Sequence, residues 1–200
     1  GHLRHLVKKL NKSSKIEVNL LIIEVRNNRE KFFSKSLLQG LPVSYNYKII
    51  KSSTKKYVGM IKVFATILIF SGKFFKKHQT DWVLVLGDRF ETLSIVLAAY
   101  ISRIKIAHIH GGETSLGSLD HGFRNAITHF ANLHFASTKN HQNRILEMLG
   151  TSQHVYNVGA LAVENIKKHR LKSNALIMHQ GEKINYEKNN FLLVTFHPVS

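Results

Sequence analysis

Cysteine is absent from the 200 residues, which excludes disulfide bonds and any chemistry that depends on a thiolate. A long apolar run is also lacking. The longest, residues 57–70, is interrupted by Lys62 and falls short of the ~20 residues that a membrane-spanning helix needs. We interpret this run as a buried or half-buried helix. Internal repeats and low-complexity tracts are missing too, so the sequence predicts a globular chain with no membrane partner.

Acidic residues are few, since 12 Asp and Glu accompany 29 Lys and Arg and give a formal net charge of +17. This balance suits an anionic partner, either a nucleic acid or a phosphorylated metabolite. The lysines, however, occur in pairs spread over the chain, without a basic arm or stripe. We therefore favour the alternative that most of this charge reflects composition and lies on solvated faces.

The alternation of apolar and polar segments predicts an α/β fold. The patterns predict helices over residues 3–10, 27–39, 56–77, 90–102, 120–131, 141–149 and 163–169. They predict strands over residues 15–25, 43–50, 82–86, 104–110, 133–137, 155–158 and 191–196. Strands and helices that alternate with short connections favour a Rossmann-like, doubly wound parallel sheet. Residues 171–190 are polar and are predicted to be an irregular linker.

The two ends of the sequence predict an incomplete unit. The first helix has no strand before it, and the last strand is followed by only four residues. We expect residues 1–170 to form a Rossmann-like N-terminal domain that lacks its first strand. Residues 171–200 would then be a linker and the first strand of a truncated C-terminal domain.

The first candidate site follows the strand predicted at 82–86, where Gly87-Asp88-Arg89-Phe90-Glu91 begins a helix. Asp88 and Glu91 have the spacing of a capping box, which is the structural interpretation. A carboxylate and a guanidinium group side by side at a helix N-terminus also suit a site that moves a proton and holds a phosphate. The residues leave both interpretations open.

The second candidate site follows the strand predicted at 104–110. Gly111 and Gly112 allow a close approach of the backbone to a ligand, or a positive φ. Glu113 should share a sheet edge with Asp88 if the two strands are parallel neighbours. His108 and His110 alternate and should face the same side of the strand, where a buried, hydrogen-bonded imidazole is the commoner explanation. A metal would need a third ligand, so we expect no metal site.

Two further stretches carry candidate residues. Ser118 and Asp120 precede a helix that carries Arg124. A helix cap with an i,i+4 ion pair is the structural alternative there, and it can coexist with substrate contact. His197 ends the last strand, where the following proline leaves the imidazole at the sheet edge. His134 is weaker, because it lies before a strand of its own.

The order and spacing of these motifs resemble the UDP-N-acetylglucosamine 2-epimerase family, and most of all its hydrolysing branch, which feeds sialic and related nonulosonic acid synthesis. The resemblance is carried by Gly87-Asp88-Arg89-Phe90-Glu91, His108-Ile109-His110-Gly111-Gly112-Glu113, Asp120 with Arg124-Asn125-Ala126-Ile127-Thr128, His134-Phe135, Val158-Gly159 and Thr195-Phe196-His197-Pro198-Val199. It covers residues 81–200, while residues 1–10 resemble the family's first helix. Residues 117–120 resemble the hydrolysing branch more than the non-hydrolysing one, which carries a Pro-Glu-Glu segment there.

The resemblance implies a GT-B-like fold of two Rossmann-like halves with a UDP-sugar in the cleft between them. The reaction would remove the C2 proton, release UDP and add water to give N-acetylmannosamine. In this scheme Asp88 is an acid/base residue and Asp120 a second catalytic carboxylate, while Arg89 and His197 hold the diphosphate. We expect Arg124, Gly111, Gly112 and Ser118 to contact the substrate as well. No cofactor is implied, and we expect a cytoplasmic homo-oligomer when the protein is full length.

The sequence departs from the family pattern in ways that bear on activity. Many members have Glu where His110 stands, so either Glu113 serves as that catalytic acid or His110 takes another role. Against that pattern, we expect the phosphate loop of the first strand and the nucleotide-binding C-terminal half to be missing from these 200 residues. We therefore expect the 200-residue chain to be inactive as it stands.

Two other function classes remain open. A related enzyme could act on a different UDP-sugar, such as a diacetylated bacillosamine, or be of the non-hydrolysing type. A basic α/β module that binds nucleic acid is the other alternative, motivated by the net charge. Asp88, Glu113 and Asp120 speak against nucleic acid, because they line the edge that phosphates would approach.

Overall fold

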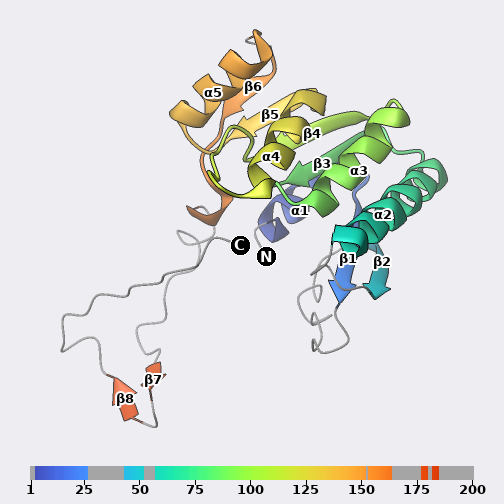
Figure 1. The fold of residues 1–200 in the computed structure, drawn as a ribbon, viewed down its shortest axis with the longest axis horizontal. Helices are drawn as coiled ribbons and strands as arrows, with labels where there is room; N and C mark the ends of the chain where they lie inside the picture. The colour runs from blue at the N-terminus through green and yellow to red at the C-terminus, as the bar shows by residue number, and fades with distance from the viewer. Residues whose placement is uncertain are drawn as a thin grey trace.

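The computed structural model describes residues 3–26, 43–51, 57–151, 153–163, 177–179 and 182–184. Its helices are α1 (Arg4–Leu10), α2 (Tyr57–His78), α3 (Phe90–Ile101), α4 (Leu119–Phe130) and α5 (Lys139–Leu149). Its strands are β1 (Asn19–Arg26), β2 (Ser44–Lys51), β3 (Trp82–Leu86), β4 (Lys105–Ile109), β5 (Leu133–Ala136), β6 (Val155–Asn157), β7 (Ile177–His179) and β8 (Glu182–Ile184). Figure 1 shows α3, α4 and α5 packed along β3–β6, with β1, β2 and α2 at one end of that layer.

The central sheet has the strand order β3-β4-β5-β6, and every neighbouring pair in it is parallel. Helix α3 connects β3 to β4, α4 connects β4 to β5, and α5 connects β5 to β6. Parallel strands joined by helices bring all the strand carboxyl ends to one edge of the sheet. This topology confirms the predicted α/β class with a Rossmann-like parallel sheet, and it places the predicted site segments at that edge.

The core lies between the central sheet and the helices α2, α3 and α4. In β3, Val83 and Val85 are buried and alternate with less buried residues, whereas β4 is buried along nearly its whole length. A central parallel strand covered on both faces has this continuous burial. Val96 of α3 and Ile127 of α4 are fully buried against the same cluster.

Strands β1 and β2 pair in parallel over eight residues and form a sheet of their own. Ile50 of β2 packs with Val63 and Ile67 of α2 in a second buried cluster, and Leu21 of β1 reaches the main core. β1 begins at Asn19 rather than at the predicted residue 15. The alternating pattern extended the prediction too far, because residues 15–17 are exposed and contribute nothing to the buried cluster.

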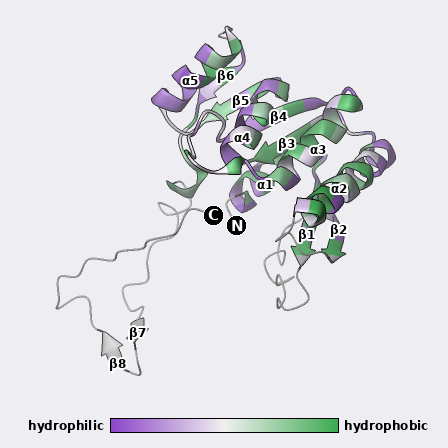
Figure 2. Cartoon of the chain, in the orientation of Figure 1, coloured by the Kyte–Doolittle hydropathy of each residue, from purple (hydrophilic) through white to green (hydrophobic). Residues whose placement is uncertain are grey.

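Helix α2 has 22 residues, and among the described helices it alone is long and apolar enough, by length and composition, to cross a membrane. The apolar run at 57–70 is too short by itself, but the helix predicted over residues 56–77 is confirmed as α2, and as a whole it reaches that length. Its buried side chains include Val63, Ile67 and Phe75, which face the core. Figure 2 shows apolar residues along α2 and the strands, and a polar α5. One face of α2 therefore packs in the core, and 28% of its most apolar window is buried.

Within the predicted irregular linker, β7 and β8 form an antiparallel hairpin, with His179 paired to Glu182. The prediction of an irregular segment is wrong at these residues. The predicted helix at 27–39, the strand at 191–196 and most of the helix at 163–169 lie outside the described residues.

Candidate functional site

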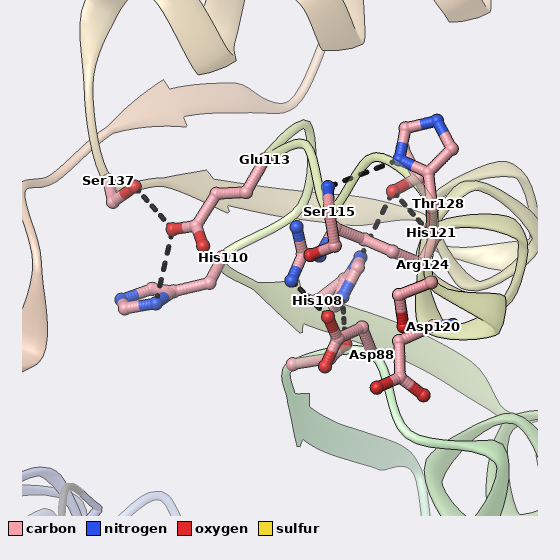
Figure 3. Close-up of polar contacts among 12 residues, drawn as sticks. Asp88, His108, His110, Glu113, Ser115, Asp120, His121, Arg124, Thr128 and Ser137 are labelled. Atoms are coloured by element: carbon pink, nitrogen blue, oxygen red, sulfur yellow. Dashed lines mark hydrogen bonds and ion pairs between the residues drawn. The ribbon is translucent and has the colours of Figure 1, made fainter. Parts of the chain in front are cut away.

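Polar residues gather where β3, β4 and β5 end, and Figure 3 shows separate sets of contacts, one joining Asp88 to α4 and another around Glu113. Gly87 follows β3 with φ +84°, and His110 follows β4 with φ +64°. These left-handed residues turn the chain sharply out of each strand. The following carboxylates, Asp88 and Glu113, therefore emerge at the same edge of the sheet.

Asp88 forms an ion pair with Arg124 of α4, whose side chain is only 8% exposed. Arg124 Nη2 donates to Asp88 Oδ2, while Nε and Nη1 are buried without a hydrogen-bond partner among the described residues. The two predicted structural roles are therefore wrong, since Arg124 pairs with Asp88 rather than Asp120, and Asp88 does not cap α3. The unused donors of a buried guanidinium group are suited to an anionic ligand.

Ser118 is the N-cap of α4, because its hydroxyl accepts a hydrogen bond from the backbone N–H of Asp120 at 3.2 Å. This is the predicted structural role for the segment. Asp120 is thereby fixed in the first turn of α4, and Figure 3 shows it on the same side of the site as Asp88. The cap therefore brings a second carboxylate to the side of the site where Asp88 lies.

Arg89 is the N-cap residue of α3, and its side chain turns back onto Glu91. Nε and Nη2 each lie 3.1 Å from a Glu91 carboxylate oxygen, and the Arg89 side chain is 72% exposed. The hydrogen bond to Glu91 is the main reason why the pKa of Arg89 is raised, and partial burial opposes it. Attraction to Asp120 and Asp88 raises that pKa further. Arg89 therefore adds exposed positive charge to the rim of the site.

Glu113 is held by a different set of partners. The Ser137 hydroxyl, just beyond β5, lies 2.6 Å from Glu113 Oε1, and His110 Nδ1 lies 3.3 Å from the same oxygen. Ser137 Oγ also lies 2.9 Å from Nδ1 of His141 in α5. The predicted arrangement of two histidines on one face of β4 is wrong, because the left-handed backbone at His110 carries that residue out of the strand.

The two glycines after His110 are buried against protein atoms. A Cβ atom on Gly111 would lie 3.0 Å from His108 Nδ1 and 3.1 Å from Thr128 Oγ1. Gly112 has φ +76°, and a Cβ atom there would overlap the His141 carbonyl oxygen. Gly112 needs glycine for close packing of this loop onto α5, whereas a side chain at Gly111 would have to displace His108 or Thr128 slightly. The predicted contact of both glycines with substrate stays a prediction.

His108 is fully buried beneath the site. Its Nε2 lies 2.9 Å from the Gly87 carbonyl oxygen and its Nδ1 lies 3.3 Å from Thr128 Oγ1, so it ties β4 to the end of β3 and to α4. Burial lowers the pKa of His108 to about 4. The imidazole is therefore a neutral structural element at pH 7, which is the predicted structural alternative.

His134 is the second buried imidazole, and it lies in β5 next to His108 in the parallel register. Burial also lowers its pKa to about 4, and the hydrogen bond to the Ala131 backbone opposes that shift. His134 is therefore neutral at pH 7 as well. Its burial is consistent with the sequence analysis, which gave His134 as a weaker site candidate than the other residues.

Sequence reasoning missed Ser137, His141 and His121. His121 accepts a hydrogen bond from the Ser115 backbone N–H at 3.4 Å, and its Nε2 lies 3.3 Å from Arg144 Nη2, so it joins the loop to α5. Ser137 stands directly after a strand, and the strand-end argument used for Asp88 would have found it. His197 lies outside the described residues, and among those described no three His, Asp or Glu side chains form a metal-binding group.

The chain is thus a parallel α/β protein that gathers carboxylates and guanidinium groups at the strand ends, the ligand-binding edge of doubly wound folds. A profile of the UDP-N-acetylglucosamine 2-epimerase family matches residues 8–200. The protein belongs to this family. The solved structures that it resembles are epimerases with a GT-B-like fold.

Relatives with curated names support the same assignment. The chain is 31% identical over 159 residues to "Polysialic acid biosynthesis protein P7" of Escherichia coli, covering 76% of this chain and 40% of the relative. It is 26% identical over 207 residues to "UDP-N,N'-diacetylbacillosamine 2-epimerase (hydrolyzing)" of Legionella pneumophila, covering 100% of this chain and 52% of the relative.

Among solved structures, UDP-GlcNAc 2-epimerase from Neisseria meningitidis bound to UDP-GlcNAc matches with a TM-score of 0.65 at 18% identity. The match covers 84% of this chain and 47% of that one. The chain thus spans about half, or less, of the length of the relatives it matches.

Proposed function

We propose that the protein, in its complete form, is a hydrolysing UDP-N-acetylglucosamine 2-epimerase that converts UDP-N-acetylglucosamine and water into N-acetylmannosamine and UDP. Family membership supports the epimerase chemistry, and relatives from Campylobacter jejuni and Legionella pneumophila with "(hydrolyzing)" in their names support the hydrolysing type. The observation that carries the proposal is the ion pair between Asp88 and the buried guanidinium group of Arg124, at the sheet edge where Asp120 and Glu113 also lie.

The reaction has two chemical stages. A carboxylate takes the C2 proton while the C1–O bond to UDP breaks, which leaves a double bond between C1 and C2. Water then adds its hydroxyl to C1 and a proton to the opposite face of C2. Because a C2–H of a sugar is barely acidic, the first stage needs both a placed base and stabilisation of the departing diphosphate.

The geometry suggests a division of roles at this edge. Asp88, with Asp120 beside it, is the candidate base for the C2 proton. Glu113, with His110 on its Oε1 atom, is the candidate for the proton exchange that accompanies water addition. The ion pair with Arg124 holds the Asp88 carboxylate in position, as a general base requires.

Positive charge for the diphosphate is available from two directions. The buried Arg124 has two donors without a partner among the described residues, and the exposed Arg89 lies at the N-terminus of α3. We propose that both contact the substrate, together with His197 and with Ser118 at the start of α4. The carboxylates among these cations favour a compact sugar nucleotide over a nucleic acid, whose continuous phosphate backbone they would repel.

A diacetylated UDP-bacillosamine is the second candidate substrate, because relatives at 31% and 26% identity carry that sugar in their names. The two substrates share the diphosphate and the C2 chemistry, and they differ in the sugar substituents. Purified protein should be incubated with each UDP-sugar, and UDP and the free sugar should be quantified by chromatography. The proposal would be overturned if UDP were released but neither substrate gave a free sugar with the inverted C2 configuration.

We further propose that the 200-residue chain alone lacks this activity, which its span of at most about half of its relatives' length supports. Two proteins should be assayed side by side: this 200-residue chain and the complete protein encoded by the reading frame that contains it. The Asp88→Asn variant of each is the matched blank for contaminating hydrolases. Measurable release of UDP by the 200-residue chain, above that blank, would contradict the second proposal and support the first.

A further inference from the structure

We propose that Ser137 and His141 are positioning residues that relay protons between Glu113 and solvent. The Ser137 hydroxyl oxygen lies 2.6 Å from Glu113 Oε1 and 2.9 Å from His141 Nδ1, so it bridges the two groups. The catalytic use of the relay rests on the proposed function, whereas the proton coupling itself is a property of these three side chains.

The fold holds the three groups together independently of any ligand. Ser137 directly follows β5, and Thr138 caps α5 by accepting from the His141 backbone N–H at 3.2 Å. This fixes His141 in the first turn of the helix. Gly112 packs against the backbone of that same turn, where no larger residue fits. The loop that carries Glu113 is therefore seated directly on the turn that carries His141.

A hydroxyl group has one proton, so Ser137 can donate to only one of its two neighbours at a time. When it donates to the Glu113 carboxylate, it accepts from His141 Nδ1–H. When it donates to an unprotonated Nδ1, it accepts from the protonated Glu113 carboxyl group. The direction in which the Ser137 hydroxyl donates is therefore coupled to the protonation states of Glu113 and His141.

The relay step balances in charge and in protons. A His141 imidazolium gives its Nδ1 proton to Ser137 Oγ, and Ser137 gives its own proton to Glu113 Oε1. The result is a neutral imidazole with its proton on Nε2 and a neutral carboxyl group. In reverse, Glu113 returns a proton that it has taken from the reacting water. His141 is half-buried and reaches solvent, where the imidazole exchanges its proton.

The titratable groups in this chain of contacts come from three elements: Glu113 and His110 from the loop after β4, Ser137 from the end of β5, and His141 from α5. His110 contacts the same Glu113 oxygen at 3.3 Å, so it shares the carboxylate but not the hydroxyl bridge. Removing the Ser137 hydroxyl therefore cuts the route to His141 and leaves the His110 contact in place.

The first test measures the coupling in the chain without substrate. The ¹³C signal of the Glu113 carboxyl carbon should follow the titration of the His141 ring in the unsubstituted chain and in Ser137→Thr, which keeps the hydroxyl. In Ser137→Ala the Glu113 signal should lose that inflection. Ser102→Ala, on an exposed serine, is the matched control and should behave as the unsubstituted chain. The relay would be overturned if the Glu113 signal showed no inflection with the titration of His141. It would also be overturned if that inflection remained in Ser137→Ala.

The second test measures its catalytic use in the complete protein. Ser137→Ala and His141→Ala should each lower kcat about a hundredfold with little change in KM, the lower end of the range for a lost proton-transfer step. Ser137→Thr should restore most of the rate, and added imidazole should rescue His141→Ala but not Ser137→Ala. His129→Ala, on an exposed histidine of α4, is the control. Equal rates in Ser137→Ala and Ser137→Thr would overturn the relay, whereas an inactive unsubstituted protein would overturn the proposed function alone.

Discussion

Asp88 and Glu113 emerge at the same edge of one sheet, yet they are held in opposite ways. Asp88 pairs with a permanent cation, the buried guanidinium group of Arg124. Glu113 is held by Ser137 and His110, which can each gain, lose or redirect a proton. The comparison teaches that fixed charge positions the first carboxylate, while exchangeable protons surround the second. A reaction that needs a base in one stage and proton exchange in the next is served by this difference.

The largest expected effect comes from the backbone that seats each carboxylate. Gly112→Ala should lower the free energy of unfolding by about 4 kcal/mol, because the added methyl group overlaps the His141 backbone and the residue has φ +76°. Gly87→Ala, at φ +84° but with open space around it, should cost only about 1 kcal/mol. Urea denaturation of both variants measures the two costs. Equal costs would show that the Glu113 loop is not seated on α5 as tightly as the contacts indicate.

The next effect tests the fixed charge itself. Asp88→Asn should lower the free energy of unfolding by about 3 kcal/mol, because it leaves a buried guanidinium group without a counter-charge. Arg124→Met is the second variant, since it removes the buried charge together with the pair and should cost less than Asp88→Asn. Both changes should abolish turnover in the complete protein. If Asp88→Asn unfolds at the same urea concentration as the unsubstituted chain, the ion pair is not the main constraint on Asp88.

Sequence patterns predicted the fold class and the sheet edge because both depend on periodicity. The apolar runs at 82–86 and 104–110 are separated by a helical pattern, which predicts parallel strands, and the carboxyl ends of such strands meet. That argument alone predicted that Asp88, Glu113 and the start of α4 share one edge. The family resemblance added the chemistry, which spacing could not supply.

The partners of each side chain could not be predicted in the same way. An i,i+4 rule pairs Asp120 with Arg124 along the helix surface, but Arg124 faces inward and meets Asp88 of the loop after β3. Strand alternation also failed at His110, since a left-handed backbone is uncommon for a residue other than glycine. Both failures arise where tertiary contacts override a local pattern.

An intermediate effect concerns the neutral histidines beneath Asp88. Burial lowers the pKa of His108 and of His134 from 6.5 to about 4, so the unfolded chain binds protons first as the pH falls. Stability is therefore fully present above about pH 6.5 and is lost toward pH 4, by roughly 1.4 kcal/mol per histidine at pH 5.5. Urea denaturation at pH 7.5 and 5.5 measures this loss. His108→Gln should have a smaller loss than the exposed-site control His129→Gln, and equal losses would contradict the neutral His108.

The smallest expected effect concerns the other ion pair at this edge, between Arg89 and Glu91. Its geometry is bidentate, with both nitrogens 3.1 Å from carboxylate oxygens, but the Arg89 side chain is 72% exposed. Because water screens such a pair, Glu91→Gln should change the free energy of unfolding by no more than about 0.5 kcal/mol. Urea denaturation alongside Asp88→Asn gives the direct comparison. If Glu91→Gln costs as much as Asp88→Asn, then solvent exposure does not determine how strongly each ion pair contributes to stability. A small cost would mean that Glu91 holds Arg89 only weakly. A bound diphosphate could then take the place of Glu91, as the proposed role of Arg89 requires.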